Sequence, residues 1–143
     1  MLRIVIFNSV IEGLKKYFKE HEIEYFFGGS RRFGYATLNS DIDIFVKSTN
    51  TDLKQVLIDA GFIQITTNID QYPEVLFRFR HFIDIVLVDD PHRYYKLDRK
   101  HVEVDLLVNS NPILRKVALE LRKFGHTGAQ IYRIFKDISD SPI

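Results

Sequence analysis

The sequence predicts an α/β (α+β) fold, in which a mixed β-sheet flanked by helices is followed by a C-terminal helical extension. Helical and strand-like patterns alternate up to Asp89-Asp90-Pro91, and the later residues are mostly helical in character. With 143 residues, 45% of them hydrophobic, the chain can build one core without a disulfide or metal. We therefore expect a core at residues 1–91 and an extension at residues 92–143 packed on it.

The N-terminal residues predict one helix and one strand. Leu2–Phe7 is a short apolar run that fits either a strand or the lead-in to a helix. Ser9, with Glu12 three residues later, has the form of a capping box. Apolar residues then recur at helical spacing, which predicts a helix over residues 9–20. Residues 23–27 form a strand pattern that stops at two glycines.

The middle of the chain predicts four strands and a helix. Residues 34–40 are loop-like, and Asp41–Lys47 returns to an alternating strand pattern. Asn50 or Thr51 can cap a helix that runs to Ala60, with Gly61 at its end. Further strands are expected at Phe62–Thr67, Val75–Phe79 and His81–Val88. The last two strands suit a hairpin that turns near Arg80.

The C-terminal third is predicted to be helical, with one segment left open. Residues 92–108 fit either a strand or a helix, since apolar residues alternate in part of the segment. Asn111-Pro112 predicts the start of a helix that runs to Phe124, before Gly125. A last short helix is expected over Thr127–Asp137. Residues 111–136 are locally basic, because Glu120 stands alone against Arg115, Lys116, Arg122, Lys123, Arg133 and Lys136.

Composition excludes several classes of site. The chain has no cysteine, which rules out disulfides, thiolate zinc sites and cysteine nucleophiles and fits a reducing cytoplasm. Apolar runs such as Ile4–Phe7 are far too short for a membrane span, and no signal-peptide cleavage pattern is present. We therefore expect a cytoplasmic protein with no membrane partner. A net charge of +1 predicts no strong global attraction to nucleic acid or lipid.

Three aspartates have the setting of a metal site. Asp41 and Asp43 are two residues apart in a strand pattern, so they lie on one face and repel each other unless a cation lies between them. Hard carboxylate oxygens suit Mg²⁺ or Mn²⁺. Asp84 is an acid within a strongly apolar strand and joins the cluster if the two strands are neighbours. Three carboxylates can hold two metal ions. The alternatives are solvated acids on an exposed strand, and an Asp84 neutralised by Arg78 or Arg80.

A glycine-rich turn precedes this acidic pair. Gly28-Gly29-Ser30 follows a strand, and glycines there let backbone N–H groups approach an anion closely. Ser30 adds a hydroxyl and, if it opens a helix, a helix N-terminus that favours phosphate. Arg31 and Arg32 can contact phosphate oxygens or lie solvated on the surface. Taken alone, such a stretch is most often only a turn.

Together these residues resemble the DNA polymerase β-like nucleotidyltransferase superfamily, in particular its minimal nucleotidyltransferases. The resemblance covers about residues 10 to 90. The frame Gly-Ser-x-x-x-Gly-x-x-x-x-x-Ser-Asp-x-Asp is filled without a gap by Gly29, Ser30, Gly34, Ser40, Asp41 and Asp43. The start of the CCA-adding enzymes, Gly-Gly-[Ala/Ser]-x-Arg, also fits residues 28–32, but the larger helical domains of those enzymes do not fit in this chain.

The resemblance implies a nucleotidyltransferase fold and a metal-dependent transfer of a nucleotidyl group from an NTP to an acceptor hydroxyl, with release of pyrophosphate. It implies that Asp41 and Asp43 bind two Mg²⁺ ions, or Mn²⁺, and that Asp84 completes the ion nearest the acceptor and is placed to accept the hydroxyl proton. The nucleotide would be held by Gly28, Gly29, Ser30, Arg31 and Ser40. The acceptor, an RNA, a protein or a small molecule, stays open.

Two other functions remain open on the same fold. One is a catalytically inactive module that binds nucleotide or nucleic acid. The other is an antitoxin-type interaction protein, since minimal family members often pair with a small helical protein. The sequence also departs from the family at two positions. Phe33 replaces an arginine common before the second glycine, and Tyr35 a glutamate common soon after it, so contacts to the nucleotide or acceptor can differ.

Overall fold

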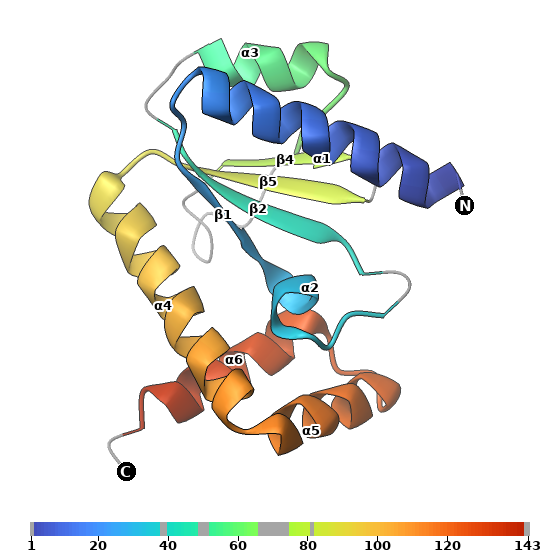
Figure 1. The fold of residues 1–143 in the computed structure, drawn as a ribbon, viewed down its shortest axis with the longest axis vertical. Helices are drawn as coiled ribbons and strands as arrows, with labels where there is room; N and C mark the ends of the chain where they lie inside the picture. The colour runs from blue at the N-terminus through green and yellow to red at the C-terminus, as the bar shows by residue number, and fades with distance from the viewer. Residues whose placement is uncertain (1, 38–39, 49–51, 66–74, 81, 142–143) are drawn as a thin grey trace.

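A computed structural model describes residues 2–37, 40–48, 52–65, 75–80 and 82–141. A five-stranded sheet in the order β1-β2-β5-β4-β3 forms its centre (Figure 1). The strands are β1 (Tyr25–Gly28), β2 (Ile42–Lys47), β3 (Ile63–Ile65), β4 (Val75–Phe79) and β5 (Ile83–Val88). The central pair, β2 and β5, is parallel, and the other neighbouring pairs are antiparallel. The expected mixed sheet is therefore confirmed.

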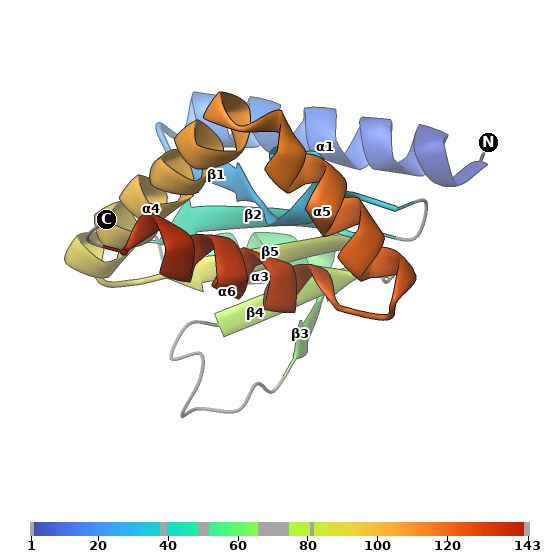
Figure 2. The same cartoon turned by 90° about the horizontal axis from the view of Figure 1, so that it is seen from below.

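Helices cover both faces of this sheet. They are α1 (Leu2–Glu20), α2 (Gly29–Phe33), α3 (Asp52–Asp59), α4 (Pro91–Ser110), α5 (Pro112–Lys123) and α6 (Gly128–Ser139). The first and third helices lie on one face, and α4 crosses the opposite face (Figures 1 and 2). The short helix α2 leaves β1 directly and lies among the C-terminal helices. None of the helices in the described part of the chain is long and apolar enough to cross a membrane.

Alternating side chains divide the apolar residues of the sheet between two layers. Ile44, Phe77 and Ile85 pack in one buried cluster with Leu14 and Phe18 of α1. The neighbouring residues in each strand point the other way, as the pleat of a strand requires. On that second face, residues such as Phe26 and Phe45 pack against Tyr94 of α4.

A third cluster joins α2 to the C-terminal helices. Phe33 and Tyr35 are 2% and 0% exposed and pack with Val104 of α4, Ala118 of α5 and Ile131 of α6. The rings of Phe33 and Tyr35 are therefore buried where the C-terminal helices cover α2.

The first helix begins earlier than predicted. It starts at Leu2, so the strand alternative for Leu2–Phe7 is excluded, and the predicted capping box at Ser9 is wrong. No glycine or proline separates Leu2–Phe7 from the residues after Ser9, and a helix, once nucleated, extends cooperatively until something stops it. Ser9 therefore lies inside the helix rather than at its start.

Most of the other predicted elements are confirmed. The open segment 92–108 lies within the single helix α4, whose cap Asp90 accepts a hydrogen bond from the backbone N–H of His92. The β4–β5 hairpin turns at Arg80, which has a φ of 54°. Helix α6 ends at Ser139, two residues beyond the prediction. The predicted cap positions Asn50 and Thr51, His81, and the end of the Phe62–Thr67 strand lie outside the described residues.

Candidate active site

Three of the predicted site residues lie in one row across neighbouring strands. Gly28 of β1 is opposite Asp43 of β2, and Asp43 is in register with Asp84 of β5. On the other side of Asp84, Arg78 of β4 completes the row. Side chains in register point to the same face of a sheet, so the two carboxylates and the guanidinium share one face. The sequence prediction that Asp84 lies beside the Asp41–Asp43 strand is confirmed.

Gly29 brings the glycine turn against the acidic pair. Its φ is +75°, in the left-handed region that glycine adopts without strain. A Cβ added at Gly29 would clash with the Oδ2 atom of Asp43. The backbone at the start of α2 therefore packs directly on the second aspartate of the motif, and any residue other than glycine there would be strained and would displace Asp43.

The surroundings of Asp43 disfavour its ionised form. Asp43 is partly buried, and burial raises the pKa of its carboxyl to about 7. The negative charges of Asp84 and Asp41 contribute to this rise, and the guanidinium of Arg78 opposes it. Removing a carboxylate from water and placing it beside two others disfavours the ionised form. A bound cation would reverse that preference, because it stabilises the ionised form.

Asp84 is paired with Arg78 in this structure. The Nε of Arg78 lies 2.8 Å from Oδ1 of Asp84, and its Nη2 lies 3.1 Å from Oδ2. The carboxylate of Asp84 is 8% exposed as a residue, so this two-point contact neutralises a buried charge. Among the described residues, no three acidic or histidine side chains already have the geometry of a metal site. Both oxygens of Asp84 are engaged by Arg78 here.

Hydrogen bonds link the residues that lie between the glycine turn and the acidic pair. Ser30 is buried in the first turn of α2. Arg31 donates hydrogen bonds from Nε and Nη2 to the backbone oxygen of Ser40, at 2.9 and 2.6 Å. The Oγ of Ser40 accepts a hydrogen bond from the backbone N–H of Thr37 at 2.8 Å. Because Asp41 follows Ser40 directly, these contacts fix the approach to the acidic pair.

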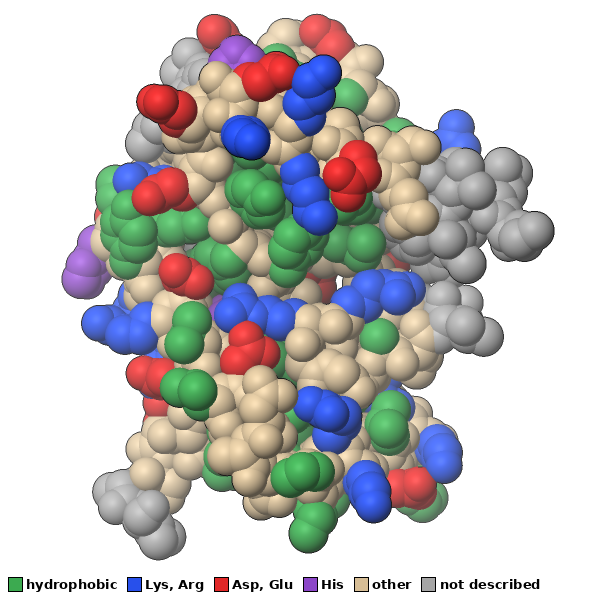
Figure 3. Space-filling view, viewed as in Figure 1, with side chains coloured by type: hydrophobic (Ala, Val, Ile, Leu, Met, Phe, Trp, Pro, Cys, Tyr) green, Lys and Arg blue, Asp and Glu red, His purple; other side chains and the backbone are tan. Residues whose placement is uncertain are grey.

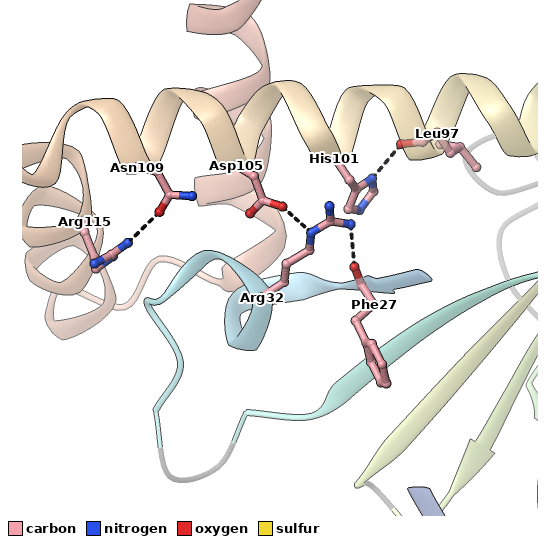
Figure 4. Close-up of polar contacts among 7 residues, drawn as sticks. All are labelled: Phe27, Arg32, Leu97, His101, Asp105, Asn109 and Arg115. Carbon is pink, nitrogen blue, oxygen red and sulfur yellow. Dashed lines mark hydrogen bonds and ion pairs between the residues drawn. The ribbon is translucent and has the colours of Figure 1, made fainter. Parts of the chain in front are cut away.

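Arg32 joins the glycine turn to α4 (Figure 4). Its Nε lies 2.6 Å from Oδ2 of Asp105, and its Nη1 donates to the backbone oxygen of Phe27 at 2.8 Å. The alternative that Arg32 lies solvated on the surface is therefore wrong, because its guanidinium is paired with Asp105. Figure 4 also shows Arg115 of α5 donating to Asn109 at the end of α4.

His101 of α4 packs against Gly28. A Cβ added at Gly28 would lie 2.9 Å from Nε2 of His101 and 2.6 Å from a ring carbon of Phe45. The imidazole is 4% exposed, and its Nδ1 lies 2.8 Å from the backbone oxygen of Leu97, to which it donates (Figure 4). Burial lowers the pKa of His101 to about 4, so the ring is neutral at physiological pH.

A protein-family model for the nucleotidyltransferase domain matches residues 8–125. The chain belongs to this family. The match includes the glycine turn, all three aspartates and most of the basic segment in α5 of this nucleotidyltransferase domain. No curated protein and no solved structure matches the chain at a significant level.

The family match confirms the predicted superfamily and fold. The roles of the single site residues remain predictions, although the structure brings Gly29, Asp43 and Asp84 together as expected. The match also runs beyond residue 91 through α4 and α5. The domain boundary after residue 91 stays a prediction as well.

Two arginines at the site were not predicted as site residues. Arg78 was considered only as a neutralising neighbour of Asp84, although a hairpin that turns near Arg80 places Arg78 opposite Asp84. Arg122 was counted only as one of the basic residues of the C-terminal segment. Its Nη2 donates to Oγ of Ser40 at 3.1 Å, a contact between residues 82 positions apart. No local pattern in the sequence indicates that contact.

Proposed function

We propose that this nucleotidyltransferase domain transfers a nucleotidyl group from an NTP to an acceptor hydroxyl and releases pyrophosphate. The observation that carries the proposal is the contact of Gly29 with the carboxylate of Asp43, in register with Asp84. It brings an anion-binding turn and an acidic pair within reach of one ligand. A triphosphate with its metal ions has both the negative charge that the turn would bind and the positive charge that the carboxylates would bind.

In this proposal the glycine turn binds the triphosphate. The N–H groups at Gly28, Gly29 and Ser30 approach the β- and γ-phosphates, and the Ser30 hydroxyl donates to a phosphate oxygen. Arg31 and Ser40 hold the loop before Asp41 against α2, so that the α-phosphate has a fixed position relative to the acids. Positioning of this kind supplies much of the rate in phosphoryl-type transfers.

The acidic row fits divalent cations by its donor chemistry. Asp41, Asp43 and Asp84 offer hard oxygen ligands, and the pKa of Asp43 is raised chiefly by burial, which a bound cation would counteract. Bound Mg²⁺ or Mn²⁺ would neutralise charge on the phosphates and on the attacking and leaving oxygens. Asp84 would exchange its contact with Arg78 for this role and accept the proton of the acceptor hydroxyl.

The test uses two labels on the nucleotide. Each of the four NTPs, labelled at the α- or the γ-phosphate, is incubated with Mg²⁺ or Mn²⁺ and with RNA, protein and small-molecule acceptors. We expect the α-label, and not the γ-label, to appear on one class of acceptor. The double variant Asp41→Asn with Asp43→Asn should lose this transfer.

Other outcomes assign the chain to a different function. Transfer of the γ-label would indicate a phosphotransferase. NTP binding without transfer to any acceptor would favour the inactive binding module. Copurification of a small helical protein in fixed ratio, without NTP binding, would favour the interaction protein. We place the reaction in the cytoplasm, since the chain lacks cysteine.

A further inference from the structure

Arg122 reaches the candidate site from the C-terminal extension. It lies at the end of α5, and its Nη2 donates to the hydroxyls of Ser40 at 3.1 Å and of Thr37 at 3.3 Å. Both hydroxyls belong to the loop that leads to Asp41. Arg122 is partly buried there, so its guanidinium is held at the site rather than extended into solvent.

The same guanidinium is also close to the glycine turn. A Cβ added at Gly128, the first residue of α6, would lie 3.4 Å from Nη1 of Arg122 and 3.6 Å from Cβ of Ser30. The Oγ of Ser30 is 3.8 Å from that position. Ser30, Arg122 and the first turn of α6 therefore meet at one point, although they come from three helices.

Arg122 has no acidic partner among the described residues. Its side-chain hydrogen bonds go to two neutral hydroxyls, whereas Arg32 and Arg78 each contact an aspartate. A partly buried guanidinium gains most from a charged acceptor, and a phosphate oxygen is such an acceptor. The contacts to Ser40 and Thr37 hold the side chain ready without neutralising it.

The surroundings of Arg122 are open and basic. It borders a surface pocket of about 460 Å³ lined by Thr37, Lys116, Leu119, Glu120, Arg122 and Lys123. Lys and Arg side chains gather over the end of the molecule that α5 forms (Figure 3). An anion can therefore approach Arg122 from solvent and meet positive potential as it does so.

We infer that Arg122 binds the triphosphate tail of the nucleotide, so that the C-terminal helices complete the nucleotide site. The inference rests on the proposed function, because it assumes that the β- and γ-phosphates bind at the glycine turn. The cluster of Phe33 and Tyr35 with Val104, Ala118 and Ile131 fixes the extension on α2 and delivers Arg122 in cis.

The experiment measures binding by calorimetry with a non-transferable NTP analogue, a nucleoside monophosphate and inorganic tripolyphosphate, all with Mg²⁺. Arg122→Gln keeps a polar side chain that can donate a hydrogen bond and removes the charge. Arg122→Lys keeps the charge and loses the planar fork. Arg133→Gln on α6 is the matched control, because Arg133 is exposed and lies in the same extension.

We expect Arg122→Gln to weaken binding of the NTP analogue and of tripolyphosphate about 10- to 100-fold, as loss of charge-assisted hydrogen bonds does. Binding of the monophosphate should change less than about threefold. Arg122→Lys should recover part of the loss, and Arg133→Gln should bind as the unmodified protein does. Thermal unfolding of each variant checks that the fold is retained.

Two results would overturn the inference. One is unchanged binding of the NTP analogue by Arg122→Gln. The other is an equal loss for the monophosphate and the triphosphate, which would show that Arg122 only holds the loop before Asp41. If the unmodified protein binds none of the four NTPs, the proposed function fails as well. If it binds NTP and depends on Arg122 but transfers nothing, only the proposed function fails.

Discussion

At the scale of single residues, Gly29 makes the most direct prediction. Gly29→Ala should destabilise the fold by at least about 1–2 kcal/mol, because the alanine must adopt a left-handed conformation. The added Cβ would also push Asp43 out of its place, so nucleotide binding should fall with stability. Urea unfolding and NTP titration measure the two effects.

Gly13 provides the control for this substitution. It lies inside α1, and no described atom lies within 4 Å of a Cβ added there. Gly13→Ala should therefore leave nucleotide binding unchanged and raise stability by up to about 1 kcal/mol, as in any exposed helix interior. Equal effects of the two substitutions would show that the contact between Gly29 and Asp43 is not required.

His101 predicts a pH dependence of stability. Its pKa is lowered to about 4 in the fold, from 6.5, so between these values the unfolded chain binds a proton that the native protein does not. Stability contributed by the neutral ring is complete above about pH 6.5 and is lost as the pH falls toward 4. The full loss is of the order of 3 kcal/mol.

The measurement compares urea unfolding of the protein and of His101→Gln from pH 4 to pH 7. The glutamine cannot be protonated, so the difference between the two free energies of unfolding should shrink as the pH falls. An NMR titration of the His101 ring should show it neutral well below pH 6. A constant difference across this range would show that burial of the ring does not control its protonation.

At the scale of elements, the link between α2 and α4 makes the third prediction. Arg32→Ala should cost about 1–3 kcal/mol, since it leaves the partly buried Asp105 and the backbone oxygen of Phe27 without their donor. Hydrogen exchange in α2 should increase with it. Arg133→Ala, an exposed arginine in α6, should change stability by less than about 0.5 kcal/mol. Equal losses in both variants would contradict the role of Arg32.

Local sequence patterns predicted which helices and strands exist better than they predicted where each one begins and ends. Alternation identified β2, apolar character identified β5, and Pro112 with Gly125 marked the ends of α5, because these signals act within a few residues. The start of α1 could not be read from Ser9, since a capping pattern competes with extension of the helix. The segment 92–108 stayed ambiguous because apolar residues such as Val104 and Val108 pack against two other helices, α5 and α6, so their spacing does not follow one simple helical face.

At the scale of the whole molecule, the site is assembled from two halves of the chain. The sheet supplies the acidic row, and the C-terminal helices supply Arg122 and cover α2 through Phe33 and Tyr35. The sequence predicted the acidic row because strand parity and family spacing act locally. The contact of Arg122 with Ser40 depends on how α5 packs, and residues so far apart in sequence carry no local sign of it.

The central claim is that Asp43 serves the bound nucleotide and its metal rather than the fold. Without a cation, the ionised carboxylate lies beside Asp41 and Asp84, and its raised pKa means that stability is lost as the pH rises from about 4 to about 7, with the full cost present above pH 7. Asp43→Asn removes this repulsion while keeping the size of the side chain. At pH 8 without metal, the variant should therefore be as stable as the unmodified protein, or more stable by about 1–3 kcal/mol.

The most direct measurement is the rate of transfer of an α-labelled nucleotide by Asp43→Asn, set beside its free energy of unfolding at the same pH. We expect transfer to fall by at least about 100-fold, since metal-ion catalysis contributes several kcal/mol, while stability is kept or increased. Added Mg²⁺ should raise the melting temperature of the unmodified protein and not that of the variant. Transfer at the unmodified rate by a folded Asp43→Asn protein would contradict the account.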